Sequence, residues 1–226
     1  MGLYADIKAT YTWNYTYIYT PAGADSIYLL IEWSALEPYS TRTSSISKPY
    51  ARDVELNIWL DPVVQVVAIY GYKGYIHSSP SSLKLELGNL YINSKQSIVI
   101  EFAFKPNAKC KRSVLSTQWR YKGATSDKIR EQAMEELYMN YTFNPGLVEK
   151  KGNFKVEKQA KLLKTPILLR EAIAIFELGD IEHAKFLIRR KGDELLLFAV
   201  QSGDLRLMEE AEKMYQFIEN CGVKPT

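Results

Sequence analysis

Residues 5–19 read ADIKATYTWNYTYIY, and the alternation in this stretch decides the class of fold. One face collects the apolar and aromatic side chains, which are Ala5, Ile7, Ala9, Tyr11, Trp13, Tyr15, Tyr17 and Tyr19. Most of the positions between them are polar. A period of two is typical of an antiparallel strand with one covered face. The stretch therefore predicts one long β-strand over residues 5–19.

The following hundred residues repeat this pattern between clusters of turn residues. The segment TPAGADS at residues 20–26 predicts a turn, so that a strand at residues 27–35 forms a hairpin with the first. Further strands are predicted at residues 53–60, 63–72, 83–87, 97–104 and 113–121. Seven or eight short strands at regular spacing are typical of an antiparallel β-sandwich, which we place at residues 1–125.

At Ser126 the spacing of the apolar residues changes. The apolar positions 129, 133, 137 and 141 recur every four residues, and Ser126 suits the N-cap of a helix. The sequence therefore predicts a helix over residues 127–141 and a helical domain over residues 126–226. The predicted fold class is α+β, with a β-sandwich followed by a small helical bundle.

Two segments of the helical part are alike, and each has a Gly-Asp pair between two apolar stretches, at residues 179–180 and 203–204. Glycine suits a left-handed turn and aspartate suits the cap of the next helix, so these pairs predict helical hairpins. Breaks are also predicted at residues 165–166, because Pro166 suits the first turn of a helix, and at residues 191–193.

Composition excludes several classes of protein. Of the 226 residues, 46% are hydrophobic and 24% are charged, which is ordinary for a globular chain. A net charge of +3 is too small to indicate nucleic-acid binding. Cys110 and Cys221 are too few for a disulfide framework, which suits a reducing compartment. Because no signal peptide or membrane span is visible, we expect a cytoplasmic protein that does not associate with membranes.

Motifs for catalysis or cofactor binding are missing from the sequence. It contains no GxSxG, HExxH, GxxxxGK[ST] or GxGxxG. His77 and His183 have no metal-ligand spacing around them, so neither a metal nor a cofactor is expected. Cys110 has basic neighbours and could be a reactive nucleophile, but a solvated basic loop explains the same residues. We therefore expect no enzymatic activity.

The aromatic face of the first predicted strand has two interpretations. Tyr11, Trp13, Tyr15 and Tyr17 could stack against a glycan or single-stranded nucleic acid. The edge of a sandwich core explains the same residues without any ligand. Because Lys and Arg do not interleave with these rings, packing in the sandwich is favoured, and nucleic acid is an unfavoured partner.

The segment that follows the predicted hairpin has no period of its own. Residues 36–52 read LEPYSTRTSSISKPYAR, and the Ser/Thr-rich joint at residues 36–51 links two strongly β-patterned segments. A connection of this length in a compact domain is usually functional or disordered. We therefore treat the joint as the first candidate for function.

Four stretches of the sandwich, DVEL (53–56), YGY (70–72), LELGNLY (85–91) and SIVIEF (97–102), carry a family resemblance. Their series resembles the β-sandwich that accompanies the von Willebrand factor type A (VWA) domain in bacterial and archaeal proteins. In that family the sandwich begins before the VWA domain, resumes after it and is followed by helices. No DxSxS adhesion motif of a VWA domain occurs here. The resemblance implies that the joint replaces the inserted domain, and an ordinary surface loop is the alternative.

The resemblance also implies a function. The layout is similar to archaeal VWA proteins that pair with a forkhead-associated (FHA) protein in the archaellum regulatory network. In that family the pair represses motility genes, and Ser/Thr kinases phosphorylate the VWA partner. FHA domains prefer phosphothreonine with a discriminating residue three places on, which fits Thr43 and Ile46. Competing acceptors are Thr41, Ser44, Ser45 and Thr226. Exposed strand edges would also permit a homodimer.

Overall fold

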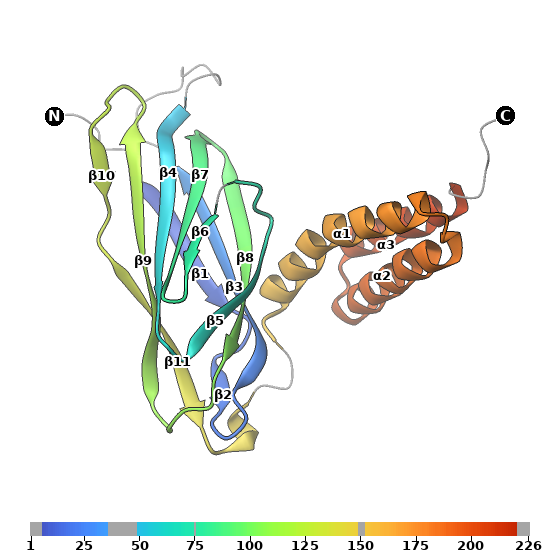
Figure 1. Cartoon of the computed structure of the whole chain (residues 1–226), viewed down its shortest axis with the longest axis horizontal. Coiled ribbons are helices and arrows are strands. Elements are labelled where there is room, and N and C mark those ends of the chain that lie inside the picture. Colours follow the sequence, from blue (N-terminus) through green and yellow to red (C-terminus); the bar gives the residue numbers. More distant parts are fainter. Residues whose placement is uncertain (1–5, 36–48, 75, 149–151, 221–226) are drawn as a thin grey trace. The chain divides into compact units, whose positions relative to one another are not determined.

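The computed structural model describes residues 6–35, 49–74, 76–148 and 152–220. The chain divides into two compact units, Met1–Ala160 and Lys161–Thr226. Over the described residues, the first unit contains eleven strands in two sheets, and three α-helices follow (Figure 1). The predicted α+β class, with a β-rich part before a helical part, is confirmed. None of the helices in the described part of the chain is long and apolar enough to cross a bilayer.

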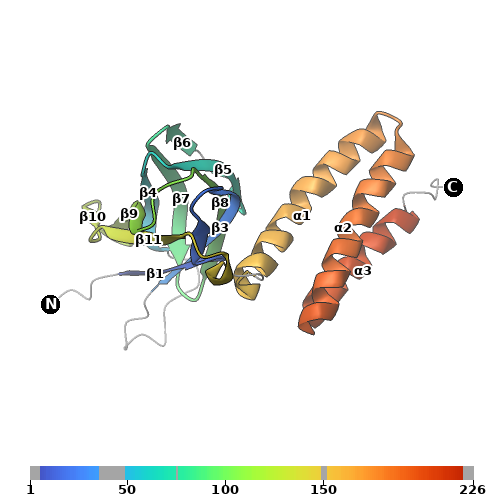
Figure 2. The same cartoon turned by 90° about the horizontal axis from the view of Figure 1, so that it is seen from below.

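Two sheets make up the β-rich unit (Figure 2). The smaller sheet has the order β1 (Ile7–Trp13), β3 (Ala24–Ala35), β8 (Lys95–Phe104) and β5 (Val64–Tyr70). The larger has the order β2 (Tyr17–Tyr19), β11 (Glu135–Thr142), β9 (Lys111–Gly123), β4 (Pro49–Leu60), β7 (Ser82–Tyr91) and β6 (Ile76–Ser79), with β10 (Ile129–Glu131) also paired to β9. Strands predicted at residues 27–35, 53–60, 63–72, 83–87, 97–104 and 113–121 correspond to β3, β4, β5, β7, β8 and β9, and are confirmed.

One hydrophobic core joins the two sheets. Leu29 and Ile100 of the smaller sheet and Leu56 and Leu85 of the larger are fully buried in the same cluster. The rings of Trp33 and Trp119 also meet between the sheets, with their centroids 5.6 Å apart. Inward-facing residues of both sheets thus form the single layer of side chains that defines a sandwich.

The single strand predicted over residues 5–19 is wrong. β1 ends at Trp13 because the buried Asn14 turns the chain, with its side-chain Oδ1 accepting a hydrogen bond from the Tyr28 backbone N–H at 2.8 Å. The chain then enters the larger sheet as β2, where Tyr17 pairs with Asn140 in parallel. Alternation continues on both sides of the break, so the period could not reveal it. The predicted pairing with residues 27–35 holds for β1, which is antiparallel to β3.

The helix predicted over residues 127–141 is also wrong. This segment forms β10 and β11, both antiparallel to β9. Leu137, Met139 and Tyr141 are buried on every second position, which is the strand period. Two of these residues also fit the four-residue spacing, and pairing with β9 decides between the alternatives. The helices therefore begin at Phe154, and the strand count is eleven over the described residues instead of seven or eight.

The α-helices are α1 (Phe154–Glu177), α2 (Ile181–Ser202) and α3 (Leu205–Asn220), after a short 3-10 turn, η1 (Pro145–Leu147). Both predicted Gly-Asp turns are confirmed. Gly203 ends α2 with φ +69°, and the Asp180 side chain accepts a hydrogen bond from the His183 backbone N–H at 3.2 Å. Asp204 accepts one in the same way from Leu207 N–H at 3.2 Å.

The breaks predicted at Pro166 and Gly192 are wrong, since both residues lie inside helices. Next to Pro166, the Thr165 hydroxyl donates to the Lys161 carbonyl oxygen at 3.0 Å, a bond that Thr commonly forms within a helix. A Cβ added at Gly192 would lie 3.1 Å from ring atoms of Tyr215. The glycine therefore serves close packing of α2 against α3.

The first turns of α1 pack on the outer face of the smaller sheet. Val156 and Ala160 are buried there, and the Gln159 side-chain amide donates to Ser97 Oγ at 3.0 Å. Glu32 of β3 accepts a hydrogen bond from Lys155 and lies 2.7 Å from Lys95 Nζ. Burial alone would raise the pKa of Glu32, but the two lysines hold it below its ordinary value.

Replacing Glu32 with glutamine should lower the free energy of unfolding at neutral pH by about 1–2 kcal/mol, because two partly exposed lysines lose their anionic partner. The pKa of Glu32 is lower in the folded chain, so its contribution is fully present above the ordinary value of 4.5 and is lost as the pH falls through the folded pKa. Urea unfolding at neutral and acid pH measures this. The exposed Glu135→Gln is the control, and an E32Q deficit that persists unchanged in acid would contradict the assignment.

Candidate interaction site

The residues proposed for phosphorylation and recognition lie outside the described residues. They are Thr41, Thr43, Ser44, Ser45, Ile46 and Thr226. The structure does describe the strands on either side of the joint: β3 ends at Ala35 in the smaller sheet, and β4 begins at Pro49 in the larger. Residues 36–48 therefore connect the two sheets of the sandwich.

The start of β4 is buried and is connected by a hydrogen bond to Asp6, just before β1. Tyr50 is buried and its hydroxyl donates to the Asp6 backbone oxygen at 3.3 Å, while the Tyr121 hydroxyl donates to the Asp6 carboxylate at the same distance. Burial, followed by the nearby Asp6 carboxylate, raises the pKa of Tyr121 to about 12. Burial also raises the pKa of Tyr50. Both hydroxyls therefore keep their protons and remain donors at neutral pH.

The pairing of β4 is irregular immediately after Ala51. The pairing with β7 shifts register between Ala51 and Val54 and again between Val54 and Glu55. Asp53 has φ +50°, a left-handed conformation that is uncommon outside glycine. On β7, Gly88 pairs with Val54 and also has a positive φ, of +75°. Bulges of this kind bend a strand and redirect its side chains, and they are frequent next to binding sites.

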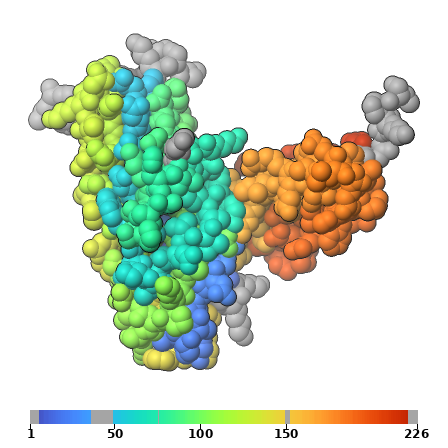
Figure 3. All heavy atoms as spheres, in the orientation of Figure 1, coloured from blue at the N-terminus to red at the C-terminus, as the bar shows by residue number. Residues whose placement is uncertain are grey.

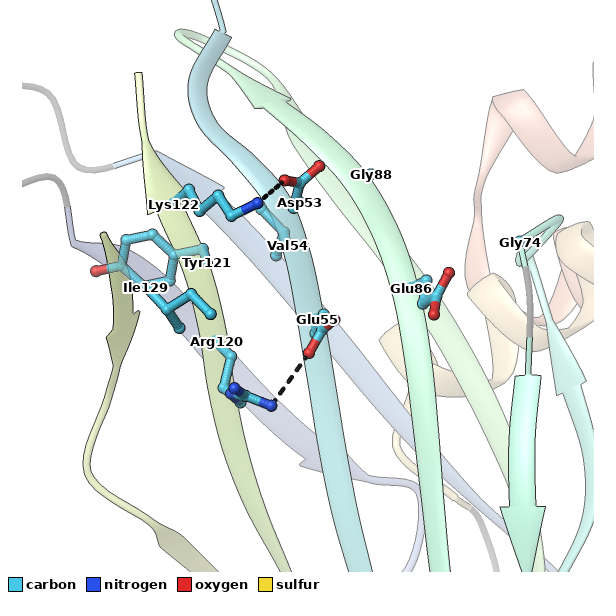
Figure 4. A pocket seen from close by; sticks show the side chains of 10 residues that line it. All are labelled: Asp53, Val54, Glu55, Gly74, Glu86, Gly88, Arg120, Tyr121, Lys122 and Ile129. Atoms are coloured by element: carbon cyan, nitrogen blue, oxygen red, sulfur yellow. Dashed lines mark hydrogen bonds and ion pairs between the residues drawn. The ribbon is translucent and has the colours of Figure 1, made fainter. Parts of the chain in front are cut away.

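A cavity of about 520 Å³ lies on this irregularity, and we call it the bulge pocket (Figure 4). Its charged lining residues are Asp53, Glu55, Glu86, Arg120 and Lys122. Lys122 Nζ lies 2.8 Å from Asp53 Oδ2, and Arg120 NH1 lies 3.6 Å from Glu55 Oε2. The hydrogen bond from Lys122 lowers the pKa of Asp53. The pocket thus offers charges of both signs to a polar partner.

The four residues of the aromatic alternative do not share one strand. Tyr11 and Trp13 belong to β1, Tyr17 belongs to β2, and Tyr15 lies between them. The Tyr11 hydroxyl oxygen accepts hydrogen bonds from Thr117 Oγ1 at 2.9 Å and Trp119 Nε1 at 2.7 Å. The Trp13 ring lies 5.8 Å from that of Phe102. These contacts place Tyr11 and Trp13 in the packing of the sandwich, and ligand stacking stays a prediction.

The other candidates are surface residues. Cys110 is exposed, and its thiol donates to the Ala108 carbonyl oxygen at 3.3 Å. His77 lies 3.3 Å from Glu86, and His183 lies 3.6 Å from Asp180. Across the ranges that the structure describes, no three His, Cys, Asp or Glu side chains are grouped so that they could hold a metal ion.

Sequence reasoning missed the bulge pocket. One signal was present, because Gly88 interrupts the alternation of LELGNLY, and a glycine inside a strand often marks a bulge. The sequence around Asp53 gives no comparable signal of its left-handed backbone conformation. Its position depends on how three neighbouring strands align, which no single segment specifies.

Comparisons with known proteins support the fold. No protein-family model and no curated protein matches the sequence. Among solved structures, a von Willebrand factor type A protein from Catenulispora acidiphila is similar with a TM-score of 0.54 and 15% identity, over 74% of this chain and 39% of that one. The ArnB paralog VWA2 from Sulfolobus acidocaldarius has a TM-score of 0.44 and 16% identity, over 73% and 38%. The BcpA pilin subunit of Bacillus cereus has a TM-score of 0.40 and 7% identity, over 59% and 40%.

For the Catenulispora protein, at 15% identity and a TM-score of 0.54, the likeness is one of fold alone. This chain shares its fold with part of the Catenulispora VWA protein, as the resemblance in the sequence implied. It spans well under two thirds of that protein, at 39% of its length.

Proposed function

We propose that this chain is a non-enzymatic protein-interaction scaffold of the VWA type. In this proposal the sandwich presents a Ser/Thr-rich segment, a Ser/Thr kinase phosphorylates it, and an FHA-domain protein binds the phosphorylated form. The biological role that we propose is the one that the resemblance implies, namely repression of archaellum genes by the pair of proteins.

The observation that carries the proposal is where residues 36–48 attach to the sandwich. They leave β3 in one sheet and rejoin β4 in the other, and the flanking Tyr50 and Ala51 are buried. In the VWA family, this is where the sandwich is interrupted by the inserted domain. The likeness in fold to part of the Catenulispora VWA protein supports the proposal.

The chemistry of the segment suits recognition by a phosphopeptide reader. Phosphate on Thr43 would add nearly two negative charges and three strong acceptor oxygens. FHA domains recognise such groups through arginine-containing sites. Ile46 supplies an apolar contact three residues later. Near the start of β4, Arg52 pairs with Asp127 at 2.9 Å and Lys122 pairs with Asp53 at 2.8 Å, so both of these cations have carboxylate partners.

The test is binding of the kinase-treated full chain to an FHA domain, measured by isothermal titration calorimetry. Thr43→Ala should weaken binding at least tenfold, or about 1.4 kcal/mol. Ile46→Ala should weaken it severalfold, because the phosphate contact remains. The matched control Thr41→Ala removes a neighbouring hydroxyl and should leave the affinity unchanged.

Two results would overturn the assignment. If the phosphorylated chain binds no better than the untreated chain, recognition does not depend on phosphate. If Thr226→Ala abolishes binding while Thr43→Ala does not, the recognised residue is at the C-terminus and the joint is not the site. Intact-mass measurement of each sample establishes that phosphate was added before binding is compared.

A further inference from the structure

β5 is an edge strand that contains no charged residue and no proline. It pairs with β8 on one side, and within the described residues no strand pairs with its other side. Its sequence, VQVVAIY, contains no residue that is charged at neutral pH. Unpaired backbone N–H and C=O groups on such an edge can accept another strand, and proteins normally prevent this with charged residues or proline. β5 has neither.

Over the described residues, the other strands at the ends of the two sheets are β1, β2 and β6. β1 contains Lys8, and antiparallel pairing of β1 with its own copy would bring like charges close together, which is unfavourable. β2 has three residues and β6 has four, so neither offers a long edge. β5, with seven residues and no charge, is therefore the end strand best suited to pair with its own copy.

An apolar groove adjoins the free edge of β5. A cavity of about 380 Å³ lies between β5 and β6, and its lining residues include Leu60, Val67, Ile69, Ile76 and Leu83 and no charged side chain. Val67 is 53% exposed and Ile76 is 44% exposed. Both strands lie on the same open side of the sandwich (Figure 2), and their residues, in teal, reach the surface (Figure 3).

We propose that a second copy of this chain covers this edge, with β5 of each copy antiparallel to β5 of the other across a two-fold axis. The groove favours an uncharged occupant, since its lining offers no opposite charge to compensate a buried one. The occupant must also be extended, in order to satisfy the edge backbone. β5 has both properties, and in a two-fold interface the same strand serves on both sides.

Val67 lies at the centre of the proposed interface. The pairing of β5 with β8 shifts register between Val66 and Ala68, so Val67 is the extra residue of a bulge. In an antiparallel pair centred on β5, the two Val67 side chains lie near the axis, and each adjoins the groove of the other copy. The interface thereby buries both exposed apolar residues, Val67 and Ile76, in both copies.

The first test is the mass of the full chain in solution, measured by light scattering and sedimentation velocity over a series of concentrations. We expect a dimer whose dissociation constant rises roughly tenfold or more in Val67→Lys, because two like charges then meet at the axis. The matched control is Ile129→Lys, which adds the same charge to a residue of the larger sheet that is 50% exposed, and should leave the dimer unchanged.

A second test probes the register and does not depend on charge. Val67→Cys, in a chain with Cys110→Ser and Cys221→Ser, should form a disulfide-linked dimer on mild oxidation, whereas Ile129→Cys in the same background should not. A chain that is monomeric at all concentrations would overturn the proposal. So would a dimer that is insensitive to V67K, or one that is equally sensitive to I129K. None of these results bears on phosphopeptide recognition.

Discussion

Replacing Phe102 with alanine is expected to lower the free energy of unfolding of the sandwich by about 3–5 kcal/mol. Phe102 is fully buried in β8, and its ring contacts those of Trp13 at 5.8 Å and Phe104 at 6.3 Å. Truncation removes apolar surface and leaves a cavity that these large, rigid rings cannot fill. Unfolding in urea, followed by tryptophan fluorescence, measures the loss.

The matched control is Phe143→Ala, since Phe143 is 58% exposed and should change stability by only about 0.5 kcal/mol or less. Phe102→Leu should recover part of the loss because it refills most of the volume. A loss below about 1 kcal/mol for F102A would mean that the two sheets do not share the close-packed core described above.

The second large effect is expected at Tyr11. Tyr11→Phe should destabilise the sandwich by about 2–4 kcal/mol, because it leaves two buried donors, Thr117 Oγ1 and Trp119 Nε1, without their acceptor. Combining it with Thr117→Val should restore part of the stability, since one unpaired donor is then removed. The control is Tyr138→Phe, which removes an exposed hydroxyl that donates to Glu136.

This experiment also separates the two interpretations of the aromatic strand. If Tyr11 serves packing, Y11F loses stability and the double variant recovers some of it. If Y11F is as stable as the parent chain, the hydroxyl is free for another role, and titration with oligosaccharides or oligonucleotides becomes the next measurement. Quenching of Trp13 fluorescence would then support the ligand platform.

The strands that sequence reasoning placed well are those bounded by strong turn residues. Asp61-Pro62 separates β4 from β5, and the hydrophobic alternation on each side specifies which face is buried. The errors have one physical origin, which is that local patterns do not reveal tertiary partners. Leu137 and Tyr141 fit both the helical and the strand period, and the pairing of β11 with β9 determines that this segment is a strand. Gly192 looks like a helix break, but Tyr215 of α3 explains it as a point of close approach.

For the site, the sequence could indicate the joint at residues 36–51 but not the pocket beside it. The joint is visible because it lacks any period and is rich in Ser and Thr. The bulge pocket depends on Asp53, Gly88 and Lys122 meeting across three strands that are far apart in the chain. That alignment is a property of the assembled sheet.

The parallel pairing of β2 with β11 bears on the order of events during synthesis. The partner of Tyr17, Asn140, is synthesised more than a hundred residues later, after β3 to β10. Until then Ile18, which is buried in the finished protein, has no place in the larger sheet. Contacts between segments that are far apart in the sequence form slowly during folding. The nascent chain therefore carries the apolar β2 segment without its partner strand while residues 20–139 are synthesised, and shielding of that segment by a chaperone would raise the yield of folded protein.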